Sequence, residues 1–217
     1  MVVLATLVGS LAAQRPLAGL KVVLDCANGA ASEVGPAALR AAGAELVFFS
    51  PLHDTALPEG IGGVYLPGGY PELHGPALAA NRPLWAALAA HVDAGKPLLA
   101  ECGGMMALFE SITHTDGTQH PVWGLLPGHV TVHKRLAALG PQQLVVDGHT
   151  LRGHTFHYST AQSDAPVVSR TSRPDEPVAA DAGEALYRLG SIHASYFHAW
   201  FPSNPLAVAR LLGGVAA

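Results

Sequence analysis

A chain of 217 residues that is 49% hydrophobic and 13% charged can bury a sizeable core, which excludes a disordered or fibrous protein and fits one compact α/β domain. The formal net charge of -4, with no basic cluster, argues against a nucleic-acid or anionic-membrane surface. Only two cysteines are present, Cys26 and Cys102, so we expect reduced thiols in a cytoplasm and no disulfide framework.

The first elements in the chain predict a doubly wound parallel sheet. Residues 1–18 are interpreted as a leader without an assigned role, because their apolar stretch lacks the positive n-region of a signal peptide and is too short to span a membrane. Residues 20–25 predict a β-branched strand, residues 36–42 a helix that stops at a glycine, and residues 45–50 the next strand. This β-loop-α-β order is the one that a parallel sheet requires.

The next elements lead to a cysteine at a sharp turn. Residues 63–67 predict a third strand that ends in Gly68 and Gly69, and Asn81 is expected to cap a helix that ends at Gly95. Residues 97–100 predict a short buried strand, after which Gly103 and Gly104 allow a turn into a helix from Met105 onward.

Cys102 is the candidate nucleophile, because a residue on a strand-to-helix elbow projects from the carboxyl edge of the sheet. We expect the helix N-terminus to stabilise a thiolate, and backbone N–H groups at the turn to hold an oxyanion. The structural alternative is a buried, unreactive cysteine, which is common for a lone cysteine. The preceding strand and the two glycines favour the catalytic interpretation, since a merely packed cysteine needs neither.

The second half of the chain predicts an antiparallel extension. Glycine and proline separate its short strand-like runs, and residues 170–183 are expected to form a surface loop. Asn204 and Pro205 predict the start of a closing helix that runs to about residue 212. The runs expected to be strands are residues 122–126, 129–132, 143–146, 155–158, 185–189 and 191–194.

Four motifs together resemble the class I glutamine amidotransferase domain of cobyrinic acid a,c-diamide synthases, in the order found in that family. They are similar to its nucleophile motif (AECGG, residues 100–104), its oxyanion loop (LPGGYPEL, residues 66–73), its GHEFHYS segment (GHTFHYS, residues 153–159) and its catalytic-histidine segment (ASYFH, residues 194–198, followed by Ser203-Asn204-Pro205). The resemblance extends from about Ala44 to the C-terminus.

This resemblance implies a flavodoxin-like, doubly wound, mainly parallel sheet with an antiparallel C-terminal extension, in one domain over residues 19–217. It implies that L-glutamine is hydrolysed in the cytoplasm, and that the ammonia amidates corrin carboxylates in cobalamin biosynthesis. The implied roles are Cys102 as nucleophile, His198 as general base, Gly68, Gly69, Gly103 and Tyr70 in oxyanion and substrate binding, and His157 as a substrate contact.

The family's ATP-binding synthetase domain has no counterpart here, because no Gly-x-x-x-x-Gly-Lys-Ser/Thr loop occurs in the sequence. The resemblance therefore implies no cofactor in this chain. ATP and magnesium are expected on a synthetase domain or subunit, which would also bring the corrin acid. No nucleic acid, membrane or metal is expected as a partner, since the histidine pairs lack a metal-site pattern.

Two departures from the family leave alternatives open. Trp200 stands where the family often has a second histidine, and Thr155 replaces the glutamate of the GHEFHYS segment, together with any contact that its carboxylate makes. The alternatives are a glutaminase of the cobyric acid synthase type, another flavodoxin-like cysteine hydrolase, or a non-catalytic binding module. Residues 19–31 resemble a segment of phosphoglucosamine mutases, but the other mutase motifs are missing and no mutase activity is expected.

Overall fold

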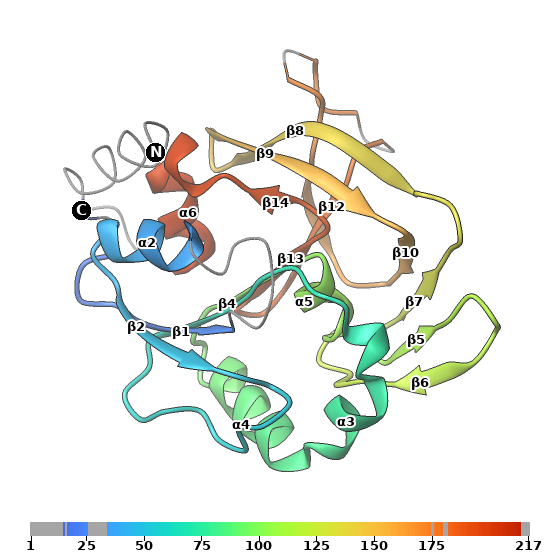
Figure 1. Ribbon diagram of the computed structural model, residues 1–217. Coiled ribbons are helices and arrows are strands. Elements are labelled where there is room, and N and C mark those ends of the chain that lie inside the picture. The colour runs from blue at the N-terminus through green and yellow to red at the C-terminus, as the bar shows by residue number, and fades with distance from the viewer. Residues whose placement is uncertain (1–14, 16, 26–33, 175, 180–181, 214–217) are drawn as a thin grey trace.

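The computed structural model describes residues 15, 17–25, 34–174, 176–179 and 182–213 (Figure 1). Most of the expected leader lies outside the described residues, as do Cys26 and the end of the mutase-like segment. Within the described ranges, no helix combines the length and the apolar character needed to cross a membrane.

A seven-stranded sheet forms the centre of the fold. Its strands are β1 (Lys21–Asp25), β2 (Glu45–Phe49), β3 (Gly63–Leu66), β4 (Leu98–Glu101), β11 (Val167–Arg170), β12 (Ala185–Leu189) and β13 (Ile192–Ser195). Strands β2, β1, β3, β4 and β13 are neighbours in that order and pair in parallel, while β12 and β11 continue the sheet antiparallel. This is the flavodoxin-like order, so the predicted fold class is confirmed.

Helices cover both faces of this sheet, as Figure 1 shows. Helix α4 (Arg82–Asp93) packs on one face, and α2 (Val34–Ala41) and α6 (Pro205–Leu211) pack on the other. Both predicted caps are confirmed, because Asn81 accepts a hydrogen bond from the Leu84 N–H and Asn204 accepts one from the Ala207 N–H.

Side chains of the parallel strands alternate between the two faces. Leu66 and Ala100 belong to the cluster beneath α4, whereas Tyr65 and Leu99 belong to the cluster beneath α2 and α6. The same alternation sends Glu101 toward the face of Leu99 and Cys102 toward the opposite one.

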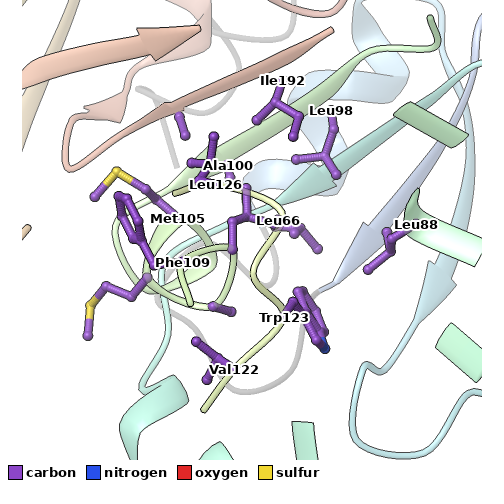
Figure 2. Packing of buried hydrophobic residues seen from close by; sticks show 14 of the residues in the cluster. Leu66, Leu88, Leu98, Ala100, Met105, Phe109, Val122, Trp123, Leu126 and Ile192 are labelled. Atoms are coloured by element: carbon purple, nitrogen blue, oxygen red, sulfur yellow. The ribbon is translucent and has the colours of Figure 1, made fainter. Parts of the chain in front are cut away.

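Figure 2 shows the core beside the nucleophile turn, where Phe109 lies next to Met105 and Val122, Trp123 and Leu126 belong to the same cluster. The strand predicted over residues 122–126 is wrong. The N–H groups of Val122 and Trp123 donate to the carbonyls of Glu110 and Ala107, so this segment packs as an irregular loop against the chain that follows the turn.

The helix expected from Met105 onward is also shorter than predicted. Helix α5 (Gly103–Met106) begins at the first glycine of the turn and makes a single turn. The carbonyls of residues 107–110 accept hydrogen bonds from residues 122–126, which is the physical reason why the helix does not continue.

Two small sheets form the extension that the sequence predicts to be antiparallel. All of their strand pairs are antiparallel except one, in which residues 111–113 pair in parallel with residues 129–131. One contains β5 (Ser111–Thr113), β6 (Gln119–Pro121), β7 (His129–Val132) and β10 (Ser159–Gln162); the other contains β8 (Ala138–Val146), β9 (His149–His157) and β14 (His198–Ala199). In Figure 1, β8 and β9 form a long curved ribbon beside β14. The remaining short elements are η1 (Pro71–Leu73), α3 (Gly75–Ala80) and η2 (Phe201–Ser203).

The expected surface loop over residues 170–183 is only partly correct. Arg170 belongs to β11, and Thr171 and Ser172 are buried. Ser172 forms an isolated antiparallel bridge with Gln143 of β8. The bridge links the start of this segment to the β8–β9 ribbon, which explains its burial.

Candidate active site

Cys102 lies between β4 and α5 with a φ of 45° and a ψ of -110°. A positive φ is costly for a residue with a side chain and is typical of strained nucleophile elbows. The backbone holds this conformation, because the Cys102 N–H donates to the Ser195 carbonyl and its carbonyl accepts from the Met106 N–H. The predicted position of Cys102 on a strand-to-helix elbow is therefore confirmed.

The expectation that the helix N-terminus stabilises a Cys102 thiolate is wrong for this conformation. The pKa of the Cys102 thiol is raised to about 12, mainly by burial; a backbone hydrogen bond at Gly103 acts against this increase, and the charges of Glu101, Glu72 and Glu184 contribute to it. Helix α5 has one turn, so its field is weak beside the cost of burial. The thiol is protonated and donates to the carbonyl of Phe156 at 3.9 Å.

His198 lines the same cavity as Cys102 but comes from a different sheet. It lies on β14, opposite His154 of β9, and the two rings stack with centroids 4.9 Å apart. Burial, with smaller contributions from the charges of His154 and His157, lowers the pKa of His198 to about 4. The imidazole is therefore neutral near pH 7, as a general base must be.

Glu101 is a residue to which the sequence analysis gave no role. Its carboxyl group is buried, with Oε1 accepting from the Ala199 N–H at 3.2 Å and Oε2 accepting from the Tyr65 hydroxyl at 2.8 Å. Oε2 also lies 4.0 Å from Nδ1 of His198, beyond hydrogen-bond distance. Burial raises the pKa of Glu101 to about 7. The sequence does contain a signal for this role, because Glu101 is an ionisable residue at the end of an apolar strand, directly before the cysteine.

Separate replacement of Glu101 and His198 by glutamine is expected to expose opposite pH dependences of the free energy of unfolding. With its pKa raised, Glu101 holds a proton more tightly when folded, so its contribution falls as pH rises from about 4.5 to about 7. With its pKa lowered, His198 binds a proton better when unfolded, so its contribution grows from about pH 4 to about 6.5. The two trends offset each other in the unmodified chain.

Urea unfolding between pH 5 and pH 6.5 measures this balance. From pH 5 to pH 6.5 we expect the free energy of unfolding of Glu101→Gln to rise by roughly 2 kcal/mol and that of His198→Gln to fall by a similar amount. The free energy of unfolding of the unmodified chain should change little. Parallel profiles for all three proteins would contradict a neutral carboxyl group beside a neutral imidazole.

The cavity at Cys102 has a volume of about 960 Å³ and includes four further residues that the sequence analysis singled out, Gly68, Gly69, Tyr70 and Gly103. A Cβ at Gly68 would lie 2.5 Å from Cε1 of His198, and one at Gly103 would lie 2.1 Å from the Gly69 carbonyl oxygen. The two glycines therefore let residues 67–70, which we call the glycine loop, approach both the imidazole and the nucleophile turn. Tyr70 is 68% exposed and lies at the mouth of the cavity.

His157 also lines the cavity, although both of its ring nitrogens face protein oxygens. Nδ1 is 2.7 Å from the Ser159 carbonyl and Nε2 is 3.0 Å from Oε1 of Glu184. Thr155 donates to the same carboxylate oxygen at 3.0 Å. A carboxylate is thus present at this position although Thr155 replaces the family's glutamate, because the segment before β12 supplies Glu184. The sequence held no signal for that contact, which joins distant segments.

Comparisons with known proteins identify relatives of this chain. A hydrogenobyrinate a,c-diamide synthase from Pseudomonas aeruginosa is 49% identical over 174 residues, covering 80% of this chain and 39% of that protein. A cobyrinate a,c-diamide synthase from Herminiimonas arsenicoxydans is 44% identical over 209 residues, covering 94% of this chain and 47% of that protein. The chain therefore spans less than half the length of these relatives.

Solved structures support the fold. A crystal structure of a glutamine amidotransferase superposes with a TM-score of 0.59 at 22% identity, covering 88% of this chain and 98% of that one. The model of one family, the CobB/CobQ-like glutamine amidotransferase domain, matches residues 37–206, which include the elbow, the glycine loop and β14. The chain belongs to this family of glutamine amidotransferase domains.

Proposed function

We propose that this chain is the glutaminase domain of a cobyrinate or hydrogenobyrinate a,c-diamide synthase. The observation that carries the proposal is the strained elbow at Cys102, which shares one cavity with the neutral imidazole of His198 and the glycine loop. The names of the relatives support the corrin acid as acceptor. Cobalamin biosynthesis in the cytoplasm is part of the same proposal.

In the proposed reaction, Sγ of Cys102 attacks the carboxamide carbon of glutamine and the thiol proton passes to His198. Backbone N–H groups near Gly69 and Gly103 hold the oxyanion. The imidazolium returns its proton to the leaving nitrogen, which departs as ammonia and leaves a thioester. Water, with His198 again accepting a proton, then hydrolyses the thioester to glutamate and restores the thiol.

The partner in this proposal is an ATP-binding synthetase domain that covers the mouth of the cavity. Six large apolar side chains that line the cavity are exposed, and we call them the apolar collar: Tyr70, Leu73, Leu139, Phe156, Tyr158 and Trp200. Such a patch around a pocket is typical of an interface. The relatives are more than twice as long as the segment they share with this chain, which supports a synthetase domain as its occupant. ATP, magnesium and the corrin acid would bind to that domain.

Selective alkylation of Cys102 tests the proposed function. We expect the diazo-ketone analogue of L-glutamine (diazo-oxo-norleucine) to modify Cys102 and to leave Cys26 unmodified, because Cys102 lines the cavity that would bind glutamine. Peptide mapping by mass spectrometry identifies the labelled cysteine. Label on Cys26 with none on Cys102 would reject the assignment of Cys102 as nucleophile.

A further inference from the structure

Glu72 carries a buried carboxylate oxygen within the cavity that contains Cys102. The residue lies in η1, directly after the glycine loop, and its side chain lines the cavity. Its Oε2 atom is buried, and among the described residues no hydrogen-bond partner reaches it. A buried carboxylate oxygen without a donor is costly, so its position in the wall of a cavity points to a ligand that supplies the donor.

The protein groups around Glu72 do not neutralise it by direct contact. Burial is the largest influence and raises the pKa of Glu72, while a hydrogen bond from its own backbone N–H and then the charges of His114 and His74 lower it. Neither imidazole forms an ion pair or a hydrogen bond with Oε2 in the described structure. The Glu72 carboxylate is therefore partly buried, and within the described structure no cationic side chain pairs with it.

The position of Glu72 matters for the nucleophile as well. After burial and the charge of Glu101, the charge of Glu72 is a further cause that raises the pKa of the Cys102 thiol. A negative charge on Glu72 opposes formation of the Cys102 thiolate, so without bound substrate this charge makes the nucleophile less reactive. A cationic group of the substrate placed against Glu72 would cancel that effect while the substrate is bound.

We propose that Glu72 binds the α-ammonium group of glutamine and thereby orients the carboxamide toward Cys102. This inference rests on the proposed glutaminase function and adds the residue that selects the amino-acid end of the substrate. Glutamine has an ammonium group at one end and its carboxamide at the other, and both Glu72 and Cys102 line the same cavity. A carboxylate paired with an ammonium group is a strong, charge-assisted contact.

The test compares two alkylating agents on the full chain. Diazo-oxo-norleucine carries the α-ammonium group, whereas iodoacetamide reaches the thiol without it. For Glu72→Gln we expect modification of Cys102 by diazo-oxo-norleucine to slow by roughly 10- to 100-fold, the loss typical of a hydrogen bond to a charged group. Modification by iodoacetamide should not slow. Glu59→Gln, at an exposed glutamate, is the matched control and should leave both rates unchanged.

Each outcome decides between the inference and its alternatives. Equal rates of diazo-oxo-norleucine labelling in Glu72→Gln and the unmodified chain would overturn the role of Glu72, while the glutaminase proposal would stand. Failure of diazo-oxo-norleucine to modify Cys102 in the unmodified chain would instead overturn the proposed function together with this inference.

A second measurement avoids any folding defect of the variant. On the unmodified chain, L-glutamine should protect Cys102 from iodoacetamide at concentrations at least 10-fold lower than glutaramate, which has the glutamine skeleton without its α-ammonium group. Glu72→Asp keeps the charge and should retain part of that preference. Equal protection by the two compounds would overturn the inference.

Discussion

His198→Ala is expected to lower the rate of glutamine hydrolysis by about 10²–10⁴-fold, the contribution typical of a general base. Burial leaves the Cys102 thiol protonated, so the reaction needs a base, and it leaves the His198 imidazole neutral and able to accept the proton. The proposed mechanism assigns this proton transfer to His198 alone. The loss should appear in kcat, since the imidazole acts on the reacting proton. Glutamate release by the chain, measured with the proposed synthetase partner present, tests this expectation.

His193→Ala is the matched control for this experiment. His193 is also a partly buried histidine whose pKa is lowered by burial, but its Nδ1 faces the Leu211 carbonyl and it does not line the cavity. We expect this variant to retain most of the activity. Equal losses in the two variants would point to a general folding defect and would reject the role of His198.

A synthetase partner with ATP and corrin acid bound is expected to raise the glutaminase rate of this chain by roughly 10²–10³-fold, the usual effect of one oxyanion donor. The proposed reason is that the lone chain favours the conformation described above, which we call the resting conformation. Its thiol donates to the Phe156 carbonyl, and within the described structure no hydrogen bond joins Sγ to the His198 ring. A partner that binds the active conformation more tightly shifts this equilibrium.

The structure indicates how docking could reach the nucleophile. Phe156 contributes its side chain to the apolar collar and its carbonyl to the thiol, so contact with the collar acts on the residue that holds Cys102 at rest. Steady-state glutamate release is measured with and without the ATP-binding domain of a cobyrinate a,c-diamide synthase added in trans. Full turnover by the lone chain, unchanged by partner, ATP and corrin acid, would favour a free-standing amidase.

Local sequence signals were sufficient to predict the parallel half of the fold. The apolar strands before Gly68 and Cys102, and the caps at Asn81 and Asn204, depend on neighbouring residues, and the structure confirms them. Residues 122–126 were predicted wrongly because their apolar run has the composition of a strand. Their backbone partners lie in residues 107–110, and no local pattern shows that pairing.

The candidate site was predictable to a similar extent. The elbow at Cys102 could be derived from its glycines, whereas the role of His198 depended on a resemblance, since β14 has only two residues and meets Cys102 through tertiary structure. The protonation of the thiol was predicted wrongly, because burial is a property of the folded chain and outweighs the field of a one-turn helix. Glu72 and Glu184 acquire their environments only when distant segments pack together.

The alternation along β4 also limits how this protein can change in evolution. Glu101 and Cys102 are adjacent in the chain but belong to opposite faces of the sheet, one toward Tyr65 and the other in the cluster with Met105. Deleting a single residue between Leu98 and Glu101 would place the thiol where the carboxyl group now lies, and inserting one would place the carboxyl group where the thiol now lies. Substitutions can accumulate around this strand, but its length is constrained by two side chains at once.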